Sequence, residues 1–136
     1  MLYPSVKILI VEDHADQAET IRYILAADLP GSTIVIAPTI KEAQKVFLES
    51  PDFTVIFMDG NMGHETTLDL IRSMRQSHRG PMVAFSQSVA LRLQQLQAGC
   101  DYLFNKGNAN EIGDFVLSIL DGTASRIEVG SLTSSQ

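Results

Sequence analysis

Short apolar runs alternate with helical segments along this chain, and the alternation limits the fold more than any other feature. The strand-like runs cover residues 6–11, 33–37, 54–58, 82–85 and 102–105. Helical periodicity is expected over residues 16–29, 40–49, 66–76, 89–98 and 112–120. Strict alternation with right-handed crossovers predicts a three-layer α/β fold, in which five strands form a doubly wound parallel sheet, (βα)5. We expect the strand order 2-1-3-4-5, although the alternation alone does not fix it.

Length and composition fit one globular domain. The chain has 136 residues, of which 45% are hydrophobic and 19% are charged, which is enough apolar material for a real core. We assign residues 1–122 to the domain. Residues 123–136 are rich in Ser, Thr and Gly and are expected to form a loose tail or the start of a linker.

The net charge, the cysteine content and the N-terminal sequence limit the partners and the cellular location that we expect for this protein. A formal net charge of −6 argues against nucleic-acid binding by this domain, which would need a basic face. Cys100 is the single cysteine, so an internal disulfide is excluded and a reducing compartment is favoured. The sequence has no secretory signal at its start and no apolar run of about 20 residues that could span a membrane. We therefore expect a cytoplasmic location and no membrane partner.

Polar residues follow four of the strand-like runs. Glu12 and Asp13 follow the first run, Asp59 follows the third, Ser86 the fourth and Lys106 the fifth. Because the carboxyl ends of parallel strands lie at one edge of a sheet, we expect these five side chains to converge on one site.

The converging residue types suit phosphoryl chemistry. Two carboxylates about 5 Å apart repel by roughly 3 kcal/mol at an effective dielectric constant of about 20, so three of them favour a bound cation. Oxygen ligands indicate Mg²⁺. Asp59 is the candidate nucleophile, and Ser86 and Lys106 could hold phosphate oxygens. Taken singly, each residue is also compatible with an ordinary role in a turn, at a helix start or on the solvated surface.

The remaining motifs add little. No Gly-rich phosphate-binding loop occurs in the sequence. The three histidines have no metal-ligand spacing, and we expect each of them at the surface; they are His14, His64 and His78.

Several segments together resemble the receiver domain of the response-regulator family of bacterial two-component systems. The resemblance covers about residues 5–122 and rests on residues 6–13, 55–59 with Met62, 84–86 and 99–106. It implies that Glu12 and Asp13 bind Mg²⁺, that Asp59 accepts the phosphoryl group, that Ser86 is the switch hydroxyl and that Lys106 bridges to the phosphate. We expect the backbone carbonyl of Asn61 to be a further Mg²⁺ ligand, with Asp13 and Asp59 direct ligands and Glu12 acting through water.

The chain departs from the family pattern at four positions. Gly63 and Gly107 stand where these domains usually have Pro, and Thr67 stands where they usually have Gly. Leu103 occupies the position of the family's switch aromatic. Tyr102 precedes it and is expected to point to the opposite face of the strand, because strand side chains alternate.

The resemblance implies a phosphoacceptor domain that takes a phosphoryl group from a histidine kinase or phosphotransfer protein. It is then no enzyme beyond Mg²⁺-dependent self-phosphorylation and autodephosphorylation. Residues 89–121 are expected to form a face for self-association or for a downstream protein. The main alternative is a pseudo-receiver, an interaction module that phosphorylation does not regulate. A Mg²⁺-dependent phosphatase would need further acids after the fourth strand, and a flavodoxin would need a Ser/Thr-rich loop after the first.

Overall fold

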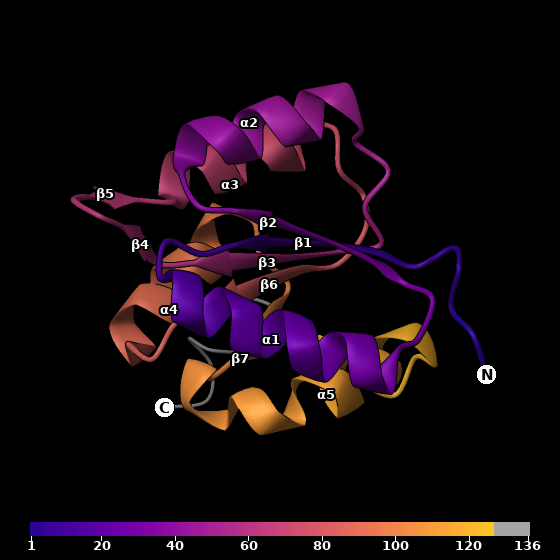
Figure 1. Ribbon diagram of the computed structural model, residues 1–136. Coiled ribbons are helices and arrows are strands. Elements are labelled where there is room, and N and C mark those ends of the chain that lie inside the picture. The colour runs from indigo at the N-terminus through magenta and orange to yellow at the C-terminus, as the bar shows by residue number, and fades with distance from the viewer. Residues whose placement is uncertain (127–136) are drawn as a thin grey trace.

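A five-stranded parallel sheet forms the centre of the computed structural model, which describes residues 1–126 (Figure 1). The strands lie in the order β2-β1-β3-β6-β7. Their bounds are Lys7–Val11 for β1, Thr33–Ala37 for β2, Val55–Asp59 for β3, Met82–Phe85 for β6 and Tyr102–Phe104 for β7. Because β6 and β7 are the fourth and fifth strands of this sheet along the chain, the predicted order 2-1-3-4-5 is confirmed.

Helices cover both faces of the sheet, which explains why its central strands are apolar throughout. On one face lie α1 (Ala15–Asp28) and α5 (Ile112–Leu120). On the other lie α2 (Ile40–Glu49), α3 (Leu68–Arg75) and α4 (Val89–Ala98). Figure 1 shows α2 and α3 above the strands and α1 and α5 below them. The predicted three-layer α/β fold is therefore confirmed.

Local sequence signals set the starts of two helices. The Thr39 hydroxyl accepts a hydrogen bond of 3.0 Å from the backbone N–H of Glu42, and the Ser88 hydroxyl accepts one of 3.2 Å from the N–H of Leu91. Both are N-caps, which satisfy a backbone donor that the first helical turn leaves free. Ser88 lies two residues after Ser86, which follows β6, and it thereby fixes where α4 begins.

A two-stranded hairpin follows Asp59, in a segment where the sequence predicted no strand. Its strands are β4 (Asn61–Met62) and β5 (Glu65–Thr66), which pair antiparallel. Gly63, in the turn, has a φ of +68°, a conformation that favours glycine. Because Thr66 takes part in this pairing, α3 begins at Leu68 and not at residue 66 as predicted.

The chain after β7 also differs from the expectation. The strand ends at Phe104, and a 3-10 helix, η1 (Lys106–Glu111), leads into α5. Asn105 begins η1, because its side-chain oxygen accepts a hydrogen bond of 2.8 Å from the N–H of Gly107. No peptide bond within residues 1–126 is cis, so the bond between Lys106 and Gly107 is trans.

Tyr102 and Leu103 lie on opposite faces of β7, as the alternation of the strand predicted. Leu103 packs against the core beneath α3 and α4, whereas Tyr102 packs on the side of α1 and α5. The Tyr102 ring meets the Phe115 ring edge-on, with the ring centres 6.2 Å apart.

His78 is buried, so its predicted place at the surface is wrong. It follows α3, meets the Phe47 ring edge-on and has Nε2 3.3 Å from the Pro81 carbonyl oxygen. The prediction failed because a polar residue in a short connection gives no sign that neighbouring elements cover it.

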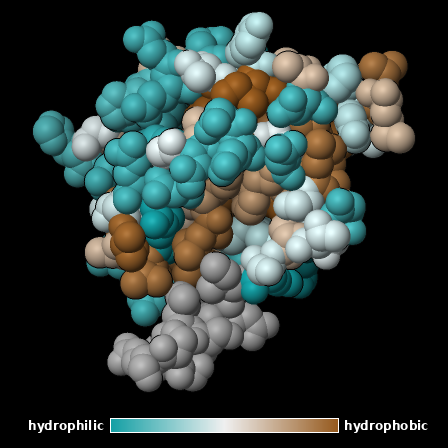
Figure 2. Space-filling view, turned by 90° about the horizontal axis from the view of Figure 1, so that it is seen from below, coloured by the Kyte–Doolittle hydropathy of each residue, from teal (hydrophilic) through white to brown (hydrophobic). Residues whose placement is uncertain are grey.

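On one face of residues 1–126, polar residues cover most of the surface (Figure 2). Figure 2 shows the face that is seen from below in Figure 1, where hydrophilic residues dominate and hydrophobic ones are exposed only in separate places. Within these residues, no helix has both the length and the apolar character needed to cross a bilayer. Most of the predicted tail, residues 127–136, lies outside the part of the chain that is described.

Candidate functional site

The polar residues that were predicted to converge do lie together at the carboxyl edge of the sheet. A cavity of about 220 Å³ is lined by Asp59 at the end of β3, Ser86 after β6 and Lys106 at the start of η1. Asn61 of the hairpin also lines it. Glu12, which follows β1, reaches the same place through Lys106. Parallel strand ends therefore form the floor of the site.

Lys106 joins two of the acids. Its Nζ lies 2.5 Å from Oε1 of Glu12 and 3.0 Å from Oδ1 of Asp59. The Lys106 side chain is only 11% exposed and Glu12 is fully covered, so solvent screens these ion pairs little. The ammonium is thus held at the bottom of the cavity, where it can face an anion bound to Asp59.

Asp59 is buried, and its surroundings make the ionised form of its carboxyl group unfavourable. Its Oδ1 accepts a hydrogen bond of 2.7 Å from the backbone N–H of Gly60. Burial, and then the negative charge of Glu12, raise the pKa of Asp59 to about 6, even though Lys106 favours the ionised form. A raised pKa means that a further positive charge near this carboxylate would be favourable.

Asp13 lies at the open side of the site. Its Oδ2 accepts a hydrogen bond of 2.9 Å from the backbone N–H of Gly63, at the tip of the hairpin. Partial burial opposes ionisation, but this hydrogen bond, the contact with Glu12 and the charge of His14 outweigh it, so the pKa of Asp13 is lowered. Asp13 is therefore a permanent anion at neutral pH.

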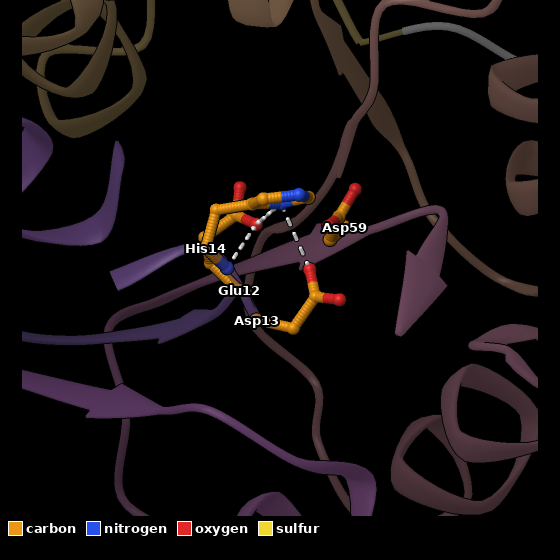
Figure 3. A group of neighbouring side chains, drawn as sticks. All are labelled: Glu12, Asp13, His14 and Asp59. Carbon is orange, nitrogen blue, oxygen red and sulfur yellow. Dashed lines mark hydrogen bonds and ion pairs between the residues drawn. The ribbon is translucent and has the colours of Figure 1, made fainter. Parts of the chain in front are cut away.

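His14 belongs to this cluster, which the sequence interpretation missed. Its Nδ1 lies 3.2 Å from Oε2 of Glu12 and 3.1 Å from Oδ1 of Asp13 (Figure 3). The Glu12 contact, followed by the charges of Asp13 and Glu12, raises the pKa of His14. The His14 side chain is 66% exposed, so the expected surface position is correct, but its ring turns toward the acids. Its place directly after Glu12 and Asp13 was the available signal.

The acidic cluster fits a divalent cation. One ligand atom from each of Glu12, Asp13, His14 and Asp59 lies within 4.8 Å of the others. Three of these are carboxylates, and among the described side chains only Lys106 and His14 approach them with positive charge. Carboxylate oxygens suit a hard cation such as Mg²⁺, whereas an imidazole nitrogen suits it less well.

Ser86 faces the same cavity from the other side. It is 7% exposed, and its Oγ accepts a hydrogen bond of 3.1 Å from the backbone N–H of Ser88. Because the hydroxyl uses only an acceptor position in that bond, its proton remains free to be donated. Arg92 of α4 donates a hydrogen bond to the Ser86 carbonyl oxygen, which ties the loop after β6 to the helix.

Beneath Asp59 lies a buried polar pair, Thr67 and Gln95, that the sequence interpretation also missed. Gln95 of α4 donates to the carbonyl oxygens of Met58 and Asp59, and the Thr67 hydroxyl donates to the Asp59 carbonyl oxygen. Both side chains are fully buried. Two helices thus hold the backbone of the strand end that carries the acid.

Together these groups can hold a doubly charged anion next to a carboxylate. Asp59 offers a nucleophilic oxygen, Lys106 a charge and Ser86 a hydroxyl, while the acids at the edge offer oxygens to a cation. This is the set of charges that a phosphoryl group needs during transfer to a carboxylate.

The family model described as the response regulator receiver domain matches residues 8–115 of this chain. Among curated proteins, none matches the chain significantly.

Solved structures with the same fold are numerous. A two-component response regulator from Clostridium difficile superposes with a TM-score of 0.76 at 23% identity, over 88% of this chain and 99% of that one. A CheY-like response regulator receiver domain protein from Methanospirillum hungatei gives 0.74 at 20% identity, over 87% and 95%. The RcsB response regulator of Salmonella typhimurium, whose structure was studied for DNA interaction, gives 0.75 at 15% identity, over 98% and 69%.

Proposed function

We propose that this chain, which belongs to the response regulator receiver domain family, accepts a phosphoryl group on Asp59 and passes the signal on through a changed surface. The observation that carries the proposal is the placement of Lys106, 3.0 Å from Asp59 Oδ1 inside a cavity that Ser86 also lines. A pseudo-receiver would have no need of this buried charge arrangement.

The hydrogen bonds of Asp59 select its reacting atom. Oδ1 is held by the Gly60 N–H and by Lys106, so we assign Oδ2 as the nucleophile. A lone pair of Oδ2 forms the new bond to phosphorus, and the bond from phosphorus to the nitrogen of a phosphohistidine breaks. The electron pair stays on that imidazole nitrogen, which takes up a proton. Lys106 and the Ser86 hydroxyl then stabilise the charge on the transferred group.

Mg²⁺ would be held by Asp13, Asp59 and the carbonyl of Asn61, with Glu12 acting through water, and would supply positive charge to the transferred oxygens. The described side chains fit this role because one carboxylate oxygen from each of Glu12, Asp13 and Asp59 lies within 4.8 Å of the others. The raised pKa of Asp59 means that its ionised form is unfavourable in this pocket when no cation is bound. A bound cation would offset that cost.

The phosphodonor is proposed to be a histidine kinase or a phosphotransfer protein that approaches over α1. A second hollow of about 220 Å³ lies beside Lys106 and is lined by Asp16, Gln17, Thr20 and Ile21 of α1, together with Gln87 and Ala109. The two hollows share Gln17, Gln87 and Lys106, so a histidine ring presented from the second would lie next to the cavity that Asp59 lines. The chemistry of the chain itself is limited to self-phosphorylation and loss of the phosphoryl group.

Incubation with acetyl phosphate and Mg²⁺, followed by intact mass measurement, tests the proposal. We expect the mass of one phosphate to be added, and the modification to be labile to hydroxylamine as an acyl phosphate is. Asp59→Asn is expected to abolish it. Asp69→Asn is the matched control, because Asp69 is an exposed acid of α3 outside the cavity.

Two results would contradict this function. If the parent gains no mass with any phosphodonor, the pseudo-receiver interpretation becomes the better one. If Asp59→Asn still gains the phosphate, another residue is the nucleophile.

A further inference from the structure

Helix α4 contacts the backbone around the phosphoacceptor at three places. Leu91 lies so close to Gly60 that a Cβ added to Gly60 would come within 2.2 Å of a Leu91 methyl carbon. Arg92 donates a hydrogen bond to the Ser86 carbonyl oxygen. One turn further along, Gln95 reaches the end of β3. The helix is therefore attached to both loops that border the cavity.

Gln95 makes the most specific of these contacts. Its Nε2 lies 2.8 Å from the carbonyl oxygen of Met58 and 3.1 Å from that of Asp59. Carbonyl oxygens can only accept, so the nitrogen of the side-chain amide must face them. The residue is fully buried, although its neighbours Gln94 and Gln97 on the same helix are exposed.

Thr67 closes the network. Gln95 Nε2 also lies 3.3 Å from the Thr67 hydroxyl, which itself donates to the Asp59 carbonyl oxygen. The backbone N–H of Thr67 donates a 3.1 Å bond to the carbonyl oxygen of Gly60. The peptide that carries Asp59 is thus held from α4 and from the start of α3 by groups that depend on one another, because hydrogen-bonded chains polarise each other.

We propose that Gln95 is a positioning residue that holds the phosphoacceptor peptide and couples occupancy of Asp59 to the position of α4. The proposal rests on the function assigned to Asp59 above. It makes α4, rather than an aromatic side chain on β7, the element that responds directly to the site.

Several observations support this coupling. A group bonded to Asp59 adds charge and bulk to this side chain and so acts on its peptide. The carbonyl oxygen of the same peptide accepts a hydrogen bond from Gln95 of α4, so a small shift of the peptide bends or breaks that bond. Because the interior is closely packed, the helix must follow the shift or lose those bonds. The apolar anchors of α4 are few, since Leu96 and Ala98 are its only buried hydrophobic residues. Its position therefore depends heavily on polar contacts.

Amide hydrogen exchange with and without beryllofluoride, a mimic of the phosphoryl group, tests the coupling. The variant is Gln95→Met, which keeps the length of the side chain but removes its donor. The matched control is Gln94→Met, an equal change on the exposed side of the same helix. Fluorine NMR reports occupancy of Asp59 in each protein.

We expect beryllofluoride to change exchange over α4 in the parent and in Gln94→Met, but to leave α4 nearly unchanged in Gln95→Met at equal occupancy. Without the mimic, exchange of the Gly60 and Thr67 amides should rise about fivefold in Gln95→Met, the loss expected for one buried hydrogen bond. Thr67→Val, which removes the other donor, should show the same ligand-free increase.

An unchanged α4 response in Gln95→Met would overturn the proposal, as would ligand-free exchange equal to that of Gln94→Met. If the mimic does not occupy Asp59 in the parent, the phosphoacceptor function fails. The ligand-free measurement then decides alone: a fivefold rise specific to Gln95→Met supports the positioning role, and its absence rejects it.

Discussion

The backbone N–H of Gly63 donates a hydrogen bond of 2.9 Å to Oδ2 of Asp13. The two residues are 50 positions apart, and the bond links the tip of the β4–β5 hairpin to one acid of the Glu12, Asp13 and Asp59 cluster. Proline, the residue that the family usually has at this position, could not make this bond because it has no N–H. The departure at Gly63 therefore changes the environment of Asp13 in a way that can be measured.

A replacement of Gly63 that removes its backbone N–H should raise the pKa of Asp13. In Gly63→Pro we expect a higher pKa, because proline has no N–H and cannot adopt the positive φ of Gly63, so the hydrogen bond that stabilises the carboxylate is lost. Gly63→Asn keeps the N–H and tolerates the positive φ, so it is the control. Carbon NMR of the Asp13 carboxyl group during a pH titration gives both values. Equal pKa values in the two variants would mean that the bond has no effect.

The raised pKa of Asp59 predicts that this residue destabilises the metal-free protein at neutral pH. The pKa of Asp59 is about 6 in the folded protein and 3.8 in the unfolded chain. Between these two pH values the folded protein keeps the proton on Asp59, whereas the unfolded chain loses it. The folded state then binds more protons than the unfolded one, so the free energy of unfolding falls as the pH rises from about 4 to about 6. Above about pH 6 the free energy of unfolding stays lowered by the full cost of ionising the buried Asp59.

Asp59→Asn removes this titration and should be the more stable protein at pH 7. We expect its advantage over the parent to grow by about 2–3 kcal/mol between pH 4 and pH 7, which corresponds to a shift of about two pKa units. Urea unfolding of both proteins at several pH values, without divalent cations, measures the difference. A constant difference across this range would show that Asp59 titrates normally.

Mg²⁺ should stabilise the folded protein by reducing the repulsion among its clustered acids. At ten times its dissociation constant, a cation that binds only the folded state adds about 1.4 kcal/mol to the free energy of unfolding. Asp13→Asn should weaken binding, whereas Asp69→Asn, on the exposed side of α3, should not. Thermal unfolding at increasing Mg²⁺ concentration gives the affinities. The assignment of Asp13 fails if its variant binds as tightly as the parent.

The sequence predicted the core of the site because strand ends are readable from composition. Asp59 and Lys106 each follow an apolar run, and parallel strands bring such ends together regardless of the distance along the chain. The ion pair between Glu12 and Lys106 follows from the same rule, although the sequence interpretation had assigned Glu12 to the cation and Lys106 to the phosphate. The strands of the β4–β5 hairpin, by contrast, have two residues each, which is too short for any periodic signal.

Gln95 could not be recognised for a different reason. Three glutamines lie close together in α4, and the sequence gives each the same chemistry. Only the rotation of the helix relative to β3 makes Gln95 face the Asp59 carbonyl while Gln94 faces solvent. That rotation follows from tertiary packing around Leu91 and Leu96, which a helical pattern with few apolar residues does not specify.

A second polar network links the connections that precede β6 and β7. Arg75, at the end of α3, donates hydrogen bonds of 2.9 Å to the carbonyl oxygens of His78, Gly80 and Gly99, and one of 2.7 Å to Oδ1 of Asp101. Burial raises the pKa of Asp101, while the nearby Arg75 charge acts in the opposite direction. The guanidinium thus satisfies three backbone acceptors and one buried carboxylate.

Arg75→Met should therefore destabilise the protein by about 3–5 kcal/mol at pH 7, because it leaves a buried charge and several acceptors without their donor. Arg72→Met is the control: its ion pair with Asp69 is exposed, so the loss should stay below about 1 kcal/mol. Without Arg75 the pKa of Asp101 should rise further, so the cost of Arg75→Met should shrink as the pH falls and Asp101 takes up a proton. Urea unfolding at pH 7 and pH 4 measures both effects. Similar losses in the two variants, or a cost for Arg75→Met that does not change with pH, would show that Arg75 contributes only packing.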